Sequence, residues 1–347
     1  MDKDNLSKIP FFFVIGRPRS GTTLIQSILD AHPNIQIPGE STILFRLYSK
    51  YKNTERIDDA LLEQLYEDII KQPKINYWPM DYAKLKADLF ELNGAFNFQK
   101  LMSVIYLNFQ SAFPKKEILA IGDKNPDYST YAGMFFKIFP DTKIIYITRD
   151  YRDHYLSMVK AGLLHNILPW IIIRWKDSVD RVDKLKQRYP KQFCSFRYED
   201  FIQDPKLHLS SLFKFLEVPD DENVLAAYES NPSSSEKYEE KRSKVFHSKI
   251  YQPVDPNNSN KWQRELNKDQ VILMDRLVGD SAKKAGYERK YIKYPLRIHW
   301  KAFSRKLVIR LFMSMKLTKK LFPMRYWLTI NQKYPTIDKV YSFFFKE

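Results

Sequence analysis

The sequence of 347 residues contains a single cysteine, Cys194. One cysteine excludes an intrachain disulfide and a cysteine-based metal site, and it favours a reducing compartment. Glycine (9) and proline (19) are too few for a collagen-like or low-complexity chain. With 44% hydrophobic and 28% charged residues, the composition is that of a folded globular protein.

Long hydrophobic runs are also missing. No apolar stretch reaches the roughly 18–20 residues that a membrane-spanning helix needs. The N-terminus, Met1-Asp2-Lys3-Asp4, lacks the basic character of a signal peptide, and the apolar segment from Ile9 to Ile15 is too short for a signal-peptide core. We therefore expect a cytoplasmic protein.

Acidic residues are absent from one long segment near the C-terminus. The chain has 57 Lys and Arg against 41 Asp and Glu, a formal net charge of +16. Thirteen of the basic residues lie between Arg289 and Ile337, where there is no Asp or Glu, so residues 1–288 carry only +3. Such a charge suggests an anionic partner, which could be nucleic acid, a membrane surface or a phosphorylated ligand.

Short apolar segments alternate with helical patterns along most of the chain. This alternation predicts an α/β fold, with a central parallel sheet flanked by helices. Residues 43–117 form a mostly helical insertion, in which Thr54 to Ile70 is the clearest helix and Thr54 its N-cap. We expect one domain over residues 1–290 and a basic helical extension over 291–347. The predicted strands are 10–15, 118–121, 143–148 and 192–197.

A polar loop, Gly16 to Thr23, lies between the first predicted strand and the first helix. Its pattern G-x-x-x-x-G-x-T has the spacing of a P-loop, whose backbone N–H groups surround an anion at a helix N-terminus. Thr22 stands where a nucleoside triphosphatase has its lysine, and the positive charge comes instead from Arg17 and Arg19. The loop therefore predicts an anion site of a different kind, formed by Arg17, Pro18, Arg19, Ser20, Gly21, Thr22 and Thr23.

The segment R-x-R-S-G-T-T-L within this loop resembles the 5′-phosphosulfate loop of the sulfotransferases, which use 3′-phosphoadenosine 5′-phosphosulfate (PAPS). A second region is similar to the family's 3′-phosphate site: the strand KIIYIT, then Arg149-Asp150, and Ser157 eight residues after Arg149. The resemblance covers roughly residues 9–290. It implies the sulfotransferase fold, PAPS as co-substrate, adenosine 3′,5′-bisphosphate (PAP) as product, and no metal.

A third similarity concerns the catalytic base. Ala31-His32-Pro33 and Gly39-Glu40 resemble the tyrosylprotein-sulfotransferase-like branch, which implies that Glu40 is the general base for the acceptor hydroxyl. Where that branch has a second acidic residue, this sequence has Ser41. His32 and His247 remain alternative bases.

The resemblance assigns further residues to the donor site. Lys124 is implied to stabilise the charge on the transferring sulfuryl group. Tyr198, at the end of the last predicted strand, and Lys261, in a late K-W pair, are implied to contact the donor phosphates. Ser248 is a weaker candidate for the phosphosulfate site, and Ser243 competes with it.

The acceptor is less well defined by the sequence. The insertion is rich in aromatic residues, which fit either an apolar core or an apolar pocket for a hydrophobic alcohol. In the tail, apolar residues recur at helical spacing with basic residues largely on the other side, which suits an anionic membrane surface or packing on the body. No nucleic-acid recognition motif is present, so we expect no nucleic-acid partner. The apolar tail residues are Trp300, Phe303, Leu307, Leu311 and Met315.

Taken together, these patterns predict a sulfotransferase acting on a lipid-like or sterol-like alcohol. A saccharide or a peptidyl tyrosine is the alternative acceptor. A different class also stays open: a P-loop kinase or nucleotidase, or a non-catalytic nucleotide-binding protein at a membrane surface. The kinase alternative would require a lysine at position 22 and an aspartate that binds magnesium.

Overall fold

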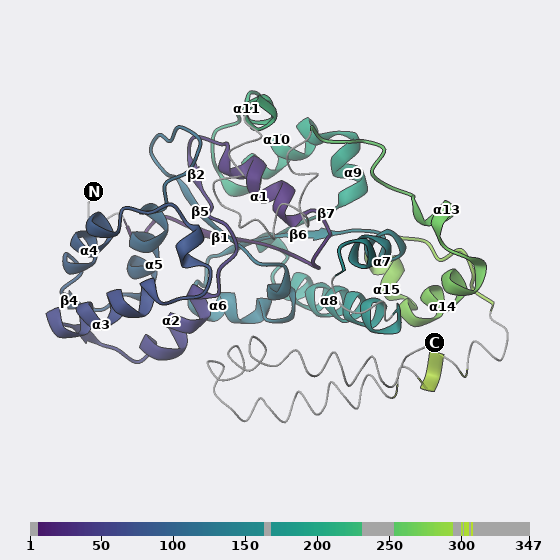
Figure 1. Ribbon diagram of the computed structural model, residues 1–347, viewed down its shortest axis with the longest axis horizontal. Helices are drawn as coiled ribbons and strands as arrows, with labels where there is room; N and C mark the ends of the chain where they lie inside the picture. Colours follow the sequence, from purple (N-terminus) through teal and green to yellow (C-terminus); the bar gives the residue numbers. More distant parts are fainter. Residues whose placement is uncertain are drawn as a thin grey trace.

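The computed structural model describes residues 6–162, 168–230 and 253–293, together with 300, 302–304 and 307. Its centre is a five-stranded sheet in the order β2-β5-β1-β6-β7, in which every pair of neighbours is parallel (Figure 1). The predicted parallel α/β sheet is therefore confirmed. The strands are β1 (Phe11–Gly16), β2 (Ile35–Gln36), β5 (Ala120–Lys124), β6 (Lys143–Thr148) and β7 (Phe193–Arg197).

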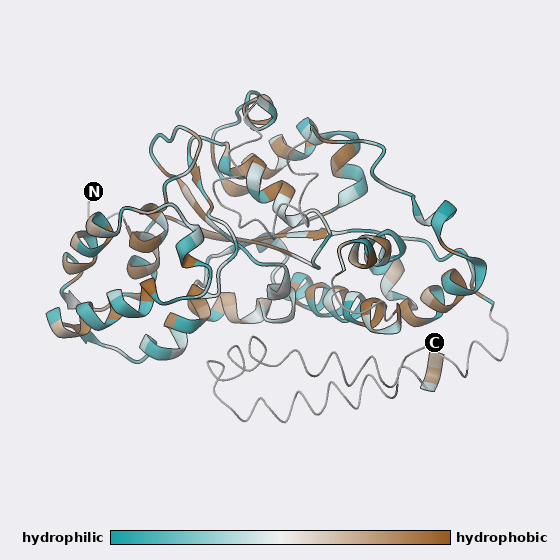
Figure 2. Cartoon of the chain, in the orientation of Figure 1, coloured by the Kyte–Doolittle hydropathy of each residue, from teal (hydrophilic) through white to brown (hydrophobic). Residues whose placement is uncertain are grey.

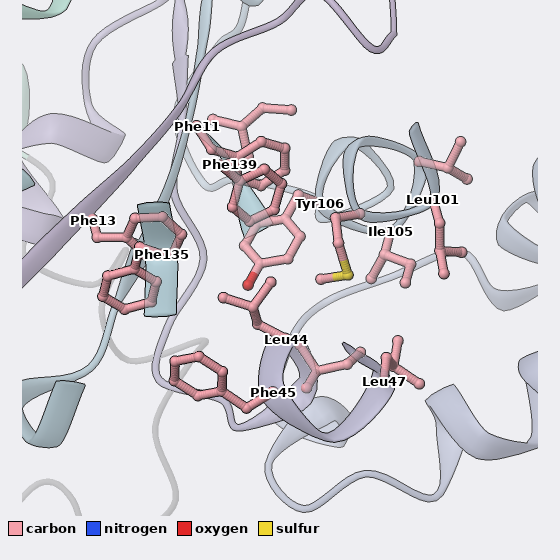
Figure 3. Close-up of a cluster of buried hydrophobic side chains, with 14 of the residues drawn as sticks. Phe11, Phe13, Leu44, Phe45, Leu47, Leu101, Ile105, Tyr106, Phe135 and Phe139 are labelled. Atoms are coloured by element: carbon pink, nitrogen blue, oxygen red, sulfur yellow. The ribbon is translucent and has the colours of Figure 1, made fainter. Parts of the chain in front are cut away.

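Strand β1 is apolar on both faces because helices cover both sides of the sheet. Phe11, Phe13 and Ile15 face one cluster, in which Phe13 stacks on Phe135 with ring centroids 3.7 Å apart (Figure 3). Phe12 and Val14 face a second cluster. Figure 2 shows the hydrophobic residues concentrated along the strands and on the helix faces that cover them.

The second cluster is formed by helices on the side of the sheet drawn at the top of Figure 1. They are α1 (Thr22–Asp30), α9 (Tyr198–Gln203), α10 (Pro205–Leu216) and α11 (Val224–Ser230). The opposite side packs against the insertion, whose helices are α2 (Ile43–Tyr51), α3 (Asp59–Ile70), α4 (Tyr82–Phe90) and α5 (Phe98–Leu107), and against α6 (Phe135–Ile138).

A third cluster of buried residues, which includes Trp175, joins helices that follow β6 in the chain. It lies to the right of the sheet in Figure 1. Its helices are α7 (Tyr151–Lys160), α8 (Leu168–Arg188), α14 (Lys268–Val278) and α15 (Ser281–Lys284). The short helix α13 (Trp262–Glu265) directly precedes α14.

Two predicted boundaries were wrong. Helix α3 starts at Asp59 and its N-cap is Asp58, because Arg56–Ile57 (β3) pairs antiparallel with Gly94–Ala95 (β4). Strand β5 continues past Ile121 to Lys124, because Asp123 and Lys124 pair with Phe13 and Val14 of β1. Because these two side chains are polar, the sequence pattern does not predict a strand here. The strand forms because the backbone pairs with β1.

Within the described residues, no helix is long and apolar enough to cross a membrane, and no three His, Cys, Asp or Glu side chains gather as metal ligands would. Of the predicted apolar tail residues, Trp300, Phe303 and Leu307 are described, with exposed fractions of 63%, 56% and 50%. Leu311 and Met315, as well as Ser243, His247 and Ser248, lie outside the described residues.

Candidate active site

The loop between β1 and α1 makes a tight turn closed by a hydrogen bond from the Ser20 N–H to the Arg17 carbonyl (3.1 Å). Arg19 and Gly21 both have left-handed backbones, with φ of 68° and 95°. Glycine is needed at position 21, since a Cβ there would lie 2.5 Å from the ring of Tyr198. No side chain of the described residues caps α1, so its first N–H groups can bind an anion.

The two donor motifs predicted from the sequence meet in space. Arg19, from the loop, donates from Nε to Oγ of Ser157 on α7 (3.3 Å). Arg149, which directly follows β6, donates from Nη1 to the carbonyl of Arg19 (3.3 Å). Arg17 and Arg149 are both buried. Guanidinium groups gathered at the carboxyl ends of β1 and β6 form a cationic site suited to phosphate.

Tyr198 and Lys261 lie at the same site. The guanidinium of Arg149 stacks over the Tyr198 ring, 4.6 Å from its centroid. Asn258 connects the group: its Nδ2 donates to the Tyr198 hydroxyl (2.8 Å), its carbonyl accepts from Arg149 (3.0 Å), and its Oδ1 accepts from Lys261 (2.8 Å). Tyr198 begins helix α9, although the sequence pattern placed it at a strand end. Asn258 was not predicted, because no motif marks it.

Three charged residues that follow Arg149 fix the position of Lys261: Asp150, Arg152 and Asp153. The guanidinium of Arg152 lies 3.7 Å from the ring centroid of Trp262, and Asp153 accepts the Trp262 backbone N–H (2.8 Å). Asp150 in turn pairs with Arg152 at 2.7 Å. Helix α13, which starts at Trp262, is therefore fixed against α7, and the position of Lys261 follows from that contact.

His154 is a residue of this site that the sequence analysis missed. It lies on α7, one turn before Ser157, and is almost fully buried. Burial lowers the pKa of His154 well below its usual value, and the nearby charges of Arg17, Arg149 and Arg19 lower it further. The imidazole is therefore neutral beside a cluster of cations.

Glu40 lies at the centre of a second charged group. Its Oε1 accepts from Nζ of Lys124 (2.9 Å), and Lys124 also donates to the hydroxyl of Thr23 in the anion loop (3.0 Å). Its Oε2 accepts from Nζ of Lys74 (3.1 Å), which comes from the insertion, directly before the 3-10 turn η1 (Ile75–Tyr77). Lys124 thus joins the predicted base to the anion loop, and Lys74 was not predicted.

The charge state of Glu40 follows from these contacts. Burial alone would raise the pKa of Glu40, but the ammonium groups of Lys124 and Lys74 outweigh it and hold the pKa well below its ordinary value. The carboxylate is therefore ionised at neutral pH, as a proton acceptor must be. The loop that carries it is held by Trp78, whose Nε1 donates to the Gly39 carbonyl (3.0 Å), and by Tyr128, which donates to the Ser41 carbonyl (3.0 Å).

His32, the alternative base, does not take part in this site. It is fully buried, its Nδ1 accepts the Asn34 backbone N–H (3.1 Å), and its Nε2 lies 2.9 Å from the Pro219 carbonyl. Both ring nitrogens are thus used in fixing the chain after α1. His32 is a structural residue.

Comparison with known proteins places residues 10–222 within the model of the sulfotransferase family. Protein-tyrosine sulfotransferase A of Caenorhabditis elegans is 23% identical over 295 residues, covering 80% of this chain and 67% of that protein. Protein-tyrosine sulfotransferase 1 of Homo sapiens is 24% identical over 291 residues, covering 81% and 70%. An uncharacterized protein of Aquifex aeolicus is 23% identical, and this chain spans only 31% of its length.

The sulfotransferase domain from the curacin biosynthetic pathway has a similar structure, with a TM-score of 0.49, 19% identity, and coverage of 80% of this chain and 98% of that one.

Proposed function

The chain belongs to the sulfotransferase family, and we propose that it transfers the sulfuryl group of PAPS to the hydroxyl group of an acceptor, with PAP as the second product. One observation carries this proposal above the others. Lys124 contacts both the ionised Glu40 and Thr23 of the anion loop, so a proton acceptor, a cation and an anion site stand next to one another. In-line transfer of an anionic group to a hydroxyl needs these three elements together.

In the proposed donor site, the loop from Arg17 to Thr23 binds the 5′-phosphosulfate and Arg149 with Ser157 binds the 3′-phosphate. The contacts between Arg19, Ser157 and Arg149 support this assignment, since they bring both motifs to one place. Tyr198 and Lys261 complete the donor site through Asn258. Ser248 remains a proposal from the sequence alone.

In the proposed reaction, Glu40 accepts the proton of the acceptor hydroxyl as its oxygen attacks sulfur. The bond between sulfur and the bridging oxygen of PAPS breaks, and that oxygen leaves as part of PAP with an additional negative charge. We expect Lys124, which contacts Thr23 of the anion loop, and Arg19, which contacts Ser157, to neutralise this charge. A cation already fixed before the reaction stabilises such a transition state without reorganising.

Donor choice can be tested without knowing the acceptor. PAP should raise the melting temperature of the protein more than ATP does, because Arg149 and Ser157 offer charge-assisted hydrogen bonds to a 3′-phosphate. Arg149→Leu should weaken PAP binding by about 10- to 100-fold, which corresponds to the roughly 1.5–3 kcal/mol of such bonds. The exposed Arg188→Leu serves as the matched control. A larger shift with ATP than with PAP would favour the kinase or nucleotidase alternative.

For the acceptor, two classes have separate support. The names of the protein-tyrosine sulfotransferase relatives support a peptidyl tyrosine. The lipid-like or sterol-like alcohol loses part of its basis, because Trp78, Tyr106 and Phe109 of the insertion are buried in the core. A screen of sterols, phenols, sugars and tyrosine peptides with labelled PAPS decides between these acceptors.

We further propose that residues 291–347 form a separate basic extension that attaches the domain of residues 1–290 to an anionic membrane. Trp300, Phe303 and Leu307 are exposed at spacings of three and four residues, as an apolar helix face requires, in a segment of the sequence rich in Lys and Arg.

Vesicle sedimentation tests this attachment. The protein should bind vesicles containing phosphatidylserine more tightly than neutral vesicles, and the double variant Trp300→Ser with Phe303→Ser should lose most of that binding. Leu207→Ser, which removes an equally exposed apolar side chain on α10, should have no effect. Equal binding to neutral vesicles, or none to either, would disprove the attachment.

A further inference from the structure

Asp123 is a buried carboxyl near Glu40 that the proposed transfer does not use. It is only 1% exposed and directly precedes Lys124 in β5. Tyr106 of α5 donates its hydroxyl proton to Oδ2 of Asp123 (2.9 Å), and the hydroxyl of Tyr128 lies 3.4 Å from the same oxygen. Tyr128 belongs to the 3-10 turn η2 (Pro126–Thr130). Figure 3 shows Tyr106 within the aromatic and aliphatic cluster, so these polar groups meet in apolar surroundings.

The number of hydrogen-bond donors around Tyr128 indicates that Asp123 carries a proton. The Tyr128 hydroxyl has a single proton, and the Ser41 carbonyl, 3.0 Å away, can only accept. If Tyr128 donates to Ser41, its remaining contact with Asp123 joins two oxygens, and a hydrogen bond there needs a proton from Asp123. A protonated Asp123 satisfies both contacts at once, whereas an ionised Asp123 competes with Ser41 for the same proton.

We propose that Asp123 is a positioning residue that carries a proton in the active protein, donates it to Tyr128, and through Tyr128 fixes the carbonyl of Ser41, the residue after Glu40. The inference rests on the proposed sulfuryl transfer. When Asp123 loses its proton, Tyr128 turns toward the carboxylate. The Ser41 carbonyl then keeps the weaker contact from Asn125 (3.3 Å), and the Glu40 loop loosens.

Burial is the main reason why this change falls near neutral pH. Burial raises the pKa of Asp123 to about 7, although the hydroxyls of Tyr106 and Tyr128 and the charge of Lys124 act to lower it, and Glu40 raises it further. The proton is therefore present below this pH and is lost as the pH rises through it. The ordered Glu40 loop belongs to the acidic side of the transition.

The pH profile of kcat/KM tests the proposal. For the wild-type protein, the rate of sulfuryl transfer should fall above about pH 7, by up to roughly tenfold per pH unit. Asp123→Asn should remain active and lose this decline, because the amide N–H donates to Tyr128 at every pH. Tyr128→Phe should be slower at all pH values and should also lack the decline. An alkaline decline in Asp123→Asn equal to that of the wild type would overturn the inference.

Hydrogen exchange of the Glu40 loop gives a second readout that needs neither donor nor acceptor. Residues 39–43 of the wild type should exchange faster than those of Asp123→Asn above about pH 7, and the two should agree at lower pH. Equal exchange at all pH values would reject the positioning role. A difference in exchange without any transfer from PAPS would instead support the positioning role and contradict the proposed function.

Discussion

Replacing Glu40 with glutamine is expected to lower the rate of sulfuryl transfer by a factor of about 10² to 10⁴, the usual contribution of a general base. Glutamine keeps the shape of the side chain and an oxygen that accepts from Lys124, but it cannot take up a proton. PAP binding should persist, because the substitution removes a negative charge from the neighbourhood of the anion loop. The measurement is the release of PAP with labelled donor, together with the melting temperature in the presence of PAP.

Glu55→Gln is the matched control for this variant, since Glu55 is an exposed glutamate of the insertion. It should behave like the wild type. If Glu40→Gln retains the wild-type rate within a few-fold, Glu40 is not the base, and the assignment of the proton acceptor fails while that of the donor site stands.

The lowered pKa of Glu40 also predicts how the rate of sulfuryl transfer depends on pH. Because Lys124 and Lys74 outweigh burial and hold the pKa of Glu40 below its ordinary value, the carboxylate stays ionised as the pH falls from neutrality to about 5. No loss of activity in this range should come from Glu40. The ion pair with Lys124 stabilises the folded protein above the ordinary pKa of a glutamate, and this stabilisation is lost only as the pH falls through the lowered pKa.

The second large effect is expected for Lys124→Met, which should lower the transfer rate by about 10²- to 10³-fold. Methionine preserves most of the buried side-chain volume but removes the cation that contacts both Glu40 and Thr23. The loss should appear mainly in kcat, because the negative charge on the leaving oxygen is larger in the transition state than in bound PAPS.

Lys52→Met, at an exposed lysine, controls for the loss of one positive charge from the protein. A rise in KM for PAPS with an unchanged kcat would mean that Lys124 only binds the donor. Glu40 in the Lys124→Met variant retains Lys74, so the melting temperature reports whether the remaining pair still holds the loop.

The arrangement of the residues proposed for the donor site could in large part be predicted from short segments of the sequence. The loop from Gly16 to Thr23 combines a glycine that needs a left-handed backbone, two arginines and a helix start, and each of these is a local property. That Arg149 and Ser157 lie close together could be predicted, because Arg149 directly follows β6 and only the first part of α7 separates it from Ser157. The α/β architecture followed in the same way from the alternation of apolar strands and helices.

The residues that were missed come together only through tertiary packing. Lys74 reaches Glu40 from the insertion, 34 positions further along the chain, and itself has a left-handed backbone that its sequence does not predict. Asn258 joins Arg149, Tyr198 and Lys261 from an irregular segment. The polar end of β5 was not recognised as a strand, because its pairing with β1 decides its structure.

Because β5 pairs with β1 in a fixed register, the position of each residue along β5 decides whether its side chain faces the anion loop or the aromatic core. Asp123 and Lys124 are consecutive residues of one strand, so their side chains leave it on opposite faces, toward Tyr106 and toward Thr23. Inserting or deleting a single residue in β5 would exchange them, placing a carboxylate beside the anion loop and an ammonium in the aromatic core. Adding or removing one residue in β5 should therefore abolish donor binding even if the protein still folds. The helical segment of residues 43–117, between β2 and β5, can change in length without exchanging the two charges.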